Sequence, residues 1–142
     1  MLVQGVHIRV SKTQIIACAL VIFGVGTRSA RADYAYAWGL NNYGQLGNGT
    51  SNPSDLYGNP SPAPVINLSG GVTSVSAGVS SGLAIQGGAA YAWGSNVDGQ
   101  LGNPSGSDSF TAISISNLST GVTAVAAGDF HSLAIKNGGV YA

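Results

Sequence analysis

The chain has 142 residues, of which only 7% are charged, against roughly 25% in an ordinary soluble domain. From Asp33 onward it carries five aspartates and one basic residue, Lys136, which gives this part a net charge of −4. An acidic body without a cationic surface disfavours binding to nucleic acid.

Residues 1–32 have the three parts of an export signal. Two basic residues, Arg9 and Lys12, precede an uncharged run of 12 residues, IIACALVIFGVG, and the string TRSARA then places Ala30 and Ala32 at the small-residue positions of a cleavage site. The run is too short to span a bilayer, which needs about 20 apolar residues. We expect a helical signal peptide that is cleaved after Ala32, and a secreted, periplasmic or cell-surface protein. The alternative is an uncleaved N-terminal anchor.

The only cysteine of the chain, Cys18, lies inside that apolar run. Export would permit disulfide bonds, but the chain after Ala32 has no cysteine with which to form one. We therefore expect packing alone to stabilise the body.

Two blocks of sequence occur twice after residue 32. The string YAWGLNNYGQLGN at 36–48 returns as YAWGSNVDGQLGN at 91–103, a step of 55 residues, and the block that begins at Leu68 returns at Leu118, a step of 50. The difference between the steps falls in the proline-rich stretch between residues 48 and 68, whose composition is typical of a loop.

Within each repeat, short runs alternate with a period of two and are bounded by glycine pairs, which predicts β-strands and tight turns. In VTAVAAG, we expect Thr123, Val125 and Ala127 to share one face of a strand. Leu133 and Ile135 share a face of the next run, and an Asn-Gly pair then predicts a hairpin turn.

Each unit of about 50 residues is therefore expected to hold four short strands, in the order APVINL or TAISISNL, VTxVxAG, GLAI or SLAI, and YAWG. Four strands at such a period are typical of a β-propeller blade. The predicted fold is all-β, with four-stranded antiparallel blades. The expected division of the body, residues 33–142, is an orphan strand and loop at about 34–62, a blade at 63–110 and a truncated blade at 111–142.

The run AGDFHSLAIKNGGVYA, joined to YAWGSNVDGQLGN, is similar to the repeat of the regulator of chromosome condensation family. The resemblance covers nearly everything from Tyr34 onward and implies a propeller, usually of seven blades, of which this chain would supply about two. It departs from the family pattern at Gly82, where the family usually has Ser, and at Ser81, where it has His. We expect an exported, bacterial-type member and the N-terminal piece of a longer product. A product that stopped here would leave strand edges open to self-association.

The resemblance assigns structural roles to the repeated motif residues. The glycines supply backbone angles that other residues resist, Asn41 and Asn96 bond the local backbone, and Leu46 and Leu101 plug the space between blades. The full set of motif residues is Trp38, Gly39, Asn41, Gly44, Gln45, Leu46, Gly47, Trp93, Gly94, Asn96, Gly99, Gln100, Leu101, Gly102, His131 and Ser132.

No catalytic, metal or cofactor site is expected. After residue 32 the chain lacks Glu, Arg and Cys and has one histidine, which cannot build a zinc site alone. Asp129, His131 and Ser132 suggest a hydrolase, but 129 and 131 point one way on a strand and 132 the other, so they cannot form a local triad.

The predicted function is that of an exported, non-catalytic module that binds a protein or a surface glycan through its loops. Tyr43 and Tyr57 lie in loops and are candidate anchors. The alternatives are a secreted inhibitor of another protein and a non-catalytic part of a larger exported enzyme. Guanine-nucleotide exchange, as in nuclear members of the family, is disfavoured by the signal segment and the acidic body. Membrane contact is expected only through the signal segment during export.

Overall fold

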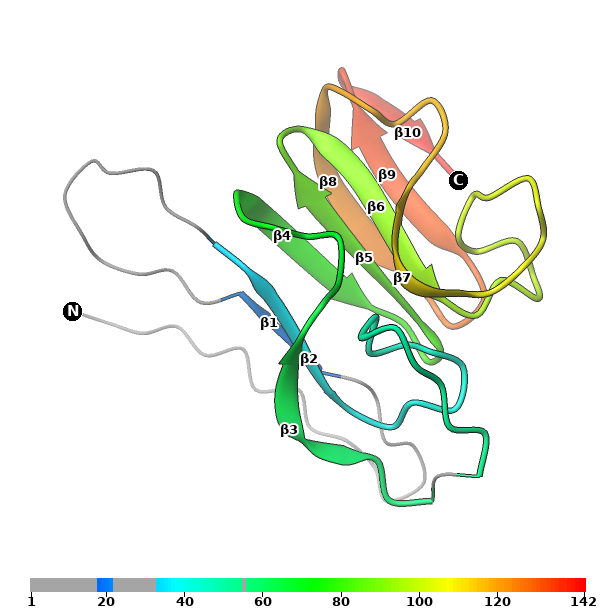
Figure 1. Cartoon of the computed structure of the whole chain (residues 1–142). Helices are drawn as coiled ribbons and strands as arrows, with labels where there is room; N and C mark the ends of the chain where they lie inside the picture. The colour runs from blue at the N-terminus through cyan, green and yellow to red at the C-terminus, as the bar shows by residue number, and fades with distance from the viewer. Residues whose placement is uncertain (1–17, 22–32, 55) are drawn as a thin grey trace, which may run out of the picture.

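The computed structural model describes residues 18–21, 33–54 and 56–142 (Figure 1). Within them the chain forms strands and no helix. The expected helical signal segment lies outside the described residues except for Cys18–Val21, and these form a strand. The strands are β1 (Cys18–Val21), β2 (Ala35–Gly39), β3 (Asn59–Pro64), β4 (Val72–Ala77), β5 (Ser81–Gln86), β6 (Ala89–Gly94), β7 (Ser109–Ser114), β8 (Val122–Ala127), β9 (Ser132–Lys136) and β10 (Gly139–Tyr141).

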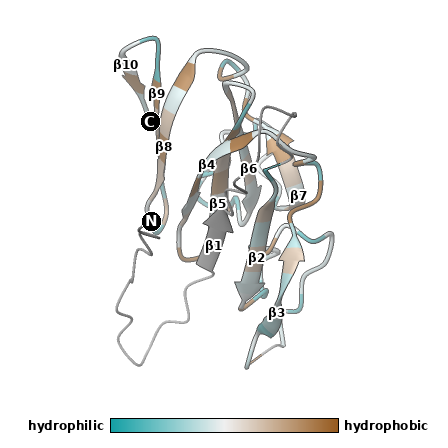
Figure 2. Cartoon of the chain, turned by 90° about the vertical axis from the view of Figure 1, so that its left-hand side faces the viewer, coloured by the Kyte–Doolittle hydropathy of each residue, from teal (hydrophilic) through white to brown (hydrophobic). Residues whose placement is uncertain are grey.

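The strands build three antiparallel sheets with the orders β1-β2-β3, β4-β5-β6-β7 and β10-β9-β8. Figure 2 shows β8, β9 and β10 at one side, β2 and β3 toward the other, and β4, β5 and β6 between them. Strands of neighbouring sheets touch, since β1 contacts β4, and both β4 and β5 contact β8. The predicted all-β fold of antiparallel, blade-like sheets is confirmed.

The division of the chain into sheets differs from the expected one by a strand. The strand in NPSPAP, β3, pairs with β2 of the preceding YAWG string, and Val65 N–H continues this ladder by donating to Ala35 O at 3.0 Å. In the next repeat Ile115 N–H donates to Ala90 O at 3.0 Å. The complete sheet therefore spans residues 72–114 rather than 63–110. A repeated sequence shows the length of the repeat but not the residue at which one sheet ends. Here the strand that follows the long loop after YAWG pairs with the YAWG strand itself, so it belongs to the preceding sheet.

A β-bulge changes the face that some residues take. The register of β8 and β9 shifts between Val122 and Ala124, and β4 has the same shift at the corresponding position. A bulge opposes two residues to one and so resets the alternation. Val122 is therefore buried near Val125, whereas Thr123 is exposed. The expectation that Thr123 shares the apolar face with Val125 is wrong for this reason.

Small residues let the sheets approach closely. A Cβ placed on Gly78 would lie 2.4 Å from the backbone oxygen of Gly128, which belongs to the next sheet. Leu83 packs near Val125 of the following sheet, while Ala84, its neighbour in β5, packs with Ala35 of the preceding one. The hydrophobic core therefore consists of layers between sheets, and these layers fix how the loops at the sheet ends are placed.

Candidate interaction surface

The topology brings four connections to one end of the sheets. β6 ends at Gly94, opposite the first residue of β5, Ser81, so the turn before β5 and the loop after β6 lie at the same end. The same order holds in the neighbouring sheets. We call this the loop end, and it comprises residues 40–54, 56–58, 78–80, 95–108 and 128–131. A backbone bond joins the first of these loops to the second sheet, because Gly49 N–H donates to the oxygen of Phe110 in β7 at 2.8 Å.

The motif asparagines hold the loops from inside. Asn41 Oδ1 accepts Leu46 N–H at 3.1 Å, and Asn96 Oδ1 accepts Leu101 N–H at 2.9 Å. Each bond closes the loop across five residues, and both leucines are completely buried where two sheets meet. Both asparagines are themselves buried, so their polar groups serve the loop and do not face solvent.

The motif glutamines act in the same way on the loop tip. Gln45 Oε1 accepts Tyr43 N–H at 2.9 Å, and Gln100 Oε1 accepts Asp98 N–H at 3.0 Å. The tips also need left-handed backbone, as at Gly44 with φ of 77°. A Cβ there would meet the ring of Phe110 at 2.3 Å, so the position requires glycine for space as well.

The backbone oxygens of these glutamines join one sheet to the next. Trp93 Nε1 donates to Gln45 O at 2.9 Å, whereas Ser132 Oγ donates to Gln100 O at 2.7 Å. Gly82 occupies the position in β5 that Ser132 has in β9, and a Cβ on Gly82 would lie 2.4 Å from the Trp93 ring. The departure from the family pattern at Gly82 therefore makes room for the indole, which reaches the equivalent carbonyl in place of the serine.

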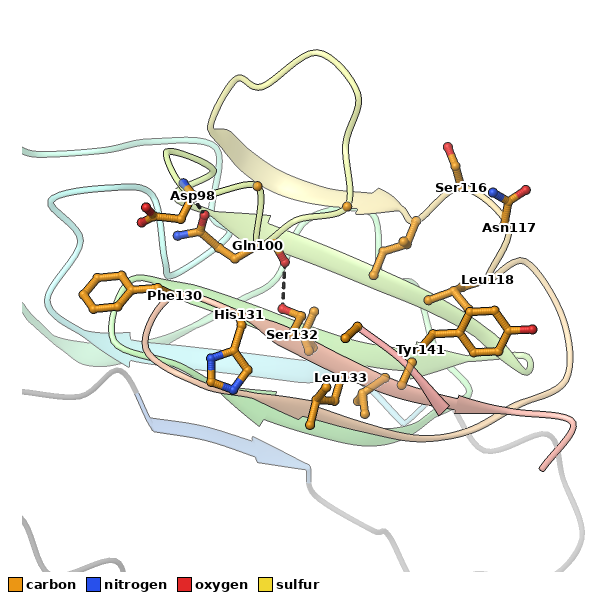
Figure 3. Close-up of a pocket in the computed structure, with 17 residues that line it drawn as sticks. Asp98, Gln100, Ser116, Asn117, Leu118, Phe130, His131, Ser132, Leu133 and Tyr141 are labelled. Atoms are coloured by element: carbon orange, nitrogen blue, oxygen red, sulfur yellow. Dashed lines mark hydrogen bonds between the residues drawn. The ribbon is translucent and has the colours of Figure 1, made fainter. Parts of the chain in front are cut away.

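The residues that suggested a hydrolase are not assembled into a catalytic group. Figure 3 shows the imidazole of His131 and the hydroxyl of Ser132 pointing in opposite directions, with Ser132 bonded to the backbone of Gln100. The His131 ring lies over Gly128, where a Cβ would be 2.4 Å from Cε1. Asp129 and His131 are both exposed.

A hollow of about 380 Å³ lies beside these residues, between the loop end of the second sheet and β9. Its lining is mainly apolar and includes Leu83, Phe130, Leu133 and Tyr141 (Figure 3). Within the described part of the chain, no group of three His, Cys, Asp or Glu side chains could hold a metal ion. Among the same residues, no helix is long and apolar enough to cross a membrane.

The loop end presents apolar side chains beside carboxylates. Tyr57 is 90% exposed and Val97 79%. The sequence singled out Tyr43 and Tyr57 but missed Val97 and Phe130, which occupy the variable positions of G-x-N-x-x-G and A-G-x-x-H. The exposed large apolar residues of the loop end are Tyr43, Leu56, Tyr57, Val97 and Phe130, and its described acids are Asp98, Asp108 and Asp129.

Comparison with known proteins agrees with the repeats. The family model "Regulator of chromosome condensation (RCC1) repeat" matches residues 33–85 and 87–135. The crystal structure of human WBSCR16 is similar in fold, with a TM-score of 0.63 and 24% sequence identity over 79% of this chain. This chain spans 29% of the length of that structure. No curated protein matches the sequence.

Proposed function

Because the chain belongs to the regulator of chromosome condensation (RCC1) repeat family, we propose that it is an exported, non-catalytic module that binds a protein or a surface glycan through its loop end. The family fold supports a role in protein interaction in general. The observation that carries the specific proposal is that several large apolar side chains are exposed at the loop end, where the motif polar groups are already hydrogen-bonded internally. Rigid loops that expose aromatic residues can anchor a partner at low entropic cost.

The absence of catalysis is part of the proposal. The polar side chains that the repeat brings together, Asn41, Asn96, Gln45 and Gln100, bond backbone groups of their own loops. The hydroxyl of Ser132 bonds the neighbouring sheet. Side chains used in this way are not available to bind or activate a substrate.

Export is supported by the pattern of residues 1–32, and the proposed location is outside the cytoplasm or at the cell surface. The acidic loop end supports a partner with a basic surface and makes nucleic acid and guanine-nucleotide exchange less suitable functions. An inhibitor of another protein would use the same exposed side chains, and so would a non-catalytic part of a larger exported enzyme.

Fractionation of cells that express the full chain with a C-terminal tag tests export. We expect the protein outside the cytoplasm, with Asp33 as the N-terminal residue. Retention in the cytoplasm with residues 1–32 attached would overturn the proposed location.

Binding is tested with purified full chain against immobilised cell-surface proteins and, separately, surface glycans. The variant Tyr43→Ser/Val97→Ser/Phe130→Ser removes exposed apolar groups from the loop end. The matched control Ile135→Ser/Val140→Ser removes exposed apolar groups of β9 and β10, away from the loop end. We expect the loop variant to lose a saturable interaction that the control keeps. Equal binding by both variants would contradict the proposed surface.

A further inference from the structure

The described part of the N-terminal segment occupies the position of a blade strand. In the second sheet, β5 pairs with the YAWG strand so that Gly82 lies opposite Trp93 and Leu83 opposite Ala92. In the first sheet, β1 pairs with the other YAWG strand so that Cys18 lies opposite Trp38 and Ala19 opposite Ala37. β1 therefore has the same register on β2 as β5 has on β6.

The sequence and the neighbours of β1 agree with this equivalence. The string CALV aligns by register with GLAI of β5, and by the repeat with SLAI of β9. β1 contacts β4, the first strand of the following sheet, as β5 contacts β8. A segment outside the repeat thus takes, in the three-stranded first sheet, the place that β5 has in the second.

The edge of β2 that β1 covers has backbone groups that β3 does not pair. Val65 N–H donates to Ala35 O, so the backbone groups of Ala35 and Ala37 point toward β3. Those of Tyr36 and Trp38 point the other way, toward β1, because direction alternates along a strand. Without β1 this edge would be free to pair with another strand.

We propose that the edge of β2 and the adjoining face of β4 form a strand-acceptor site, and that the apolar core of the N-terminal segment, Cys18–Val21, is its occupant for as long as it stays attached to the body. The pairing of β1 with β2 does not rest on the proposed function, whereas its removal by cleavage rests on the proposed export. The same four residues lie in the apolar run that has the pattern of a signal-peptide core. They cannot pair with β2 and act as an export signal at the same time. Cleavage after Ala32 would remove the occupant and leave the edge of β2 without its partner strand.

Disulfide trapping in the full chain tests the register. Ala19 and Ala37 form a non-hydrogen-bonded pair, in which Cα atoms lie about 4.5 Å apart, within the span of roughly 4.4–6.8 Å that a disulfide needs. In a Cys18→Ser background, Ala19→Cys/Ala37→Cys should cross-link within one chain under mild oxidation. The matched control, Leu20→Cys/Ala37→Cys, should not cross-link, because a shift of one residue puts the cysteines on opposite faces.

Equal cross-linking of the two pairs, or none in the first pair while the variant still unfolds cooperatively, would overturn the proposal. Cross-links only between chains would also overturn it, because a second copy would then be the occupant.

Hydrogen exchange provides a second measurement should the cysteine variants fail to fold. Leu20 lies opposite Tyr36 in a hydrogen-bonded position, whereas the N–H of Val21 points away from β2. Leu20→Pro should therefore remove the protection of the Tyr36 and Trp38 amides that the unmodified chain shows, and Val21→Pro should leave it. Protection that is absent from the unmodified chain, or unaffected by Leu20→Pro, would contradict the proposal.

Discussion

At the scale of single residues, Gly82 shows how a neighbouring side chain determines what a repeat position tolerates. Its φ lies outside the left-handed region, but a Cβ would be 2.4 Å from two carbons of the Trp93 ring. We predict that Gly82→Ser, which restores the usual family residue, lowers the free energy of unfolding by about 1–3 kcal/mol through overpacking. Urea unfolding of the full chain measures this. The control Ser132→Ala loses one hydrogen bond without a clash and should cost only about 1 kcal/mol. Unchanged stability of Gly82→Ser would show that the indole is free to move.

Ser81 is a buried polar residue with an unusual environment. It is 1% exposed, and its Oγ has no hydrogen-bond partner among the described residues. Because an unsatisfied buried hydroxyl costs about 1–3 kcal/mol, Ser81→Ala should leave the free energy of unfolding unchanged or raise it. Thermal unfolding of the two serine variants side by side checks the sign, since Ser132→Ala should lower stability. A larger loss for Ser81→Ala than for Ser132→Ala would contradict the prediction.

At the scale of secondary-structure elements, β3 carries its own protection against edge pairing. Pro60, Pro62 and Pro64 lie at alternate, exposed positions. Pro64 lies opposite Tyr36, while the next N–H, that of Val65, points to β2. The position of the missing N–H of Pro64 therefore falls on the free edge of the sheet, where proline prevents another strand from pairing. Pro60 and Pro62 lie in the stretch where the register of β3 shifts, between Asn59 and Ala63.

We predict that replacing all three prolines by serine increases concentration-dependent association, because the free edge then gains a backbone donor at position 64. Light scattering over a concentration series is the measurement. The control Pro53→Ser/Pro104→Ser removes loop prolines and so has the same kind of effect on the unfolded chain without altering a strand edge. Equal scattering by the two variants would show that the edge is protected by something else.

Strands could be predicted from the sequence because period-two alternation and glycine pairs are local signals. The bulge in β8 could not be predicted, since the string V-T-A-V is compatible with a regular strand as well as with a bulged one. Only the structure shows that Val122 and Val125 pack against the same core cluster, on one face of the strand. The residues at which each sheet ends could not be predicted either. They are defined by the hydrogen bonds that Val65 and Ile115 donate to strands earlier in the chain, β2 and β6.

At the scale of the whole molecule, the candidate surface was only partly predictable. Tyr43 and Tyr57 could be chosen because aromatic residues in polar loops stand out. Val97 could not, because its exposure depends on the asparagine and glutamine bonds that fold the motif inward and leave its variable positions outside. Phe130 could not, because its exposure depends on the turn that the bond from Gly128 N–H to His131 O closes. Conversely, His131 and Ser132 suggested chemistry as neighbours in sequence, but the strand separates them.

Burial in this architecture depends on the next sheet, and two equivalent leucines make this measurable. Leu83 in β5 is 1% exposed because β8 covers it, whereas Leu133 in β9 is 38% exposed, although the strand sequences are nearly identical. Leu83→Ala should therefore lower the free energy of unfolding by about 2–5 kcal/mol, and Leu133→Ala by much less. Urea unfolding of both variants at low protein concentration is the measurement. If Leu133→Ala proved as costly as Leu83→Ala, the face of β9 would be covered in solution, and a rise in stability with protein concentration would identify a second copy as the cover.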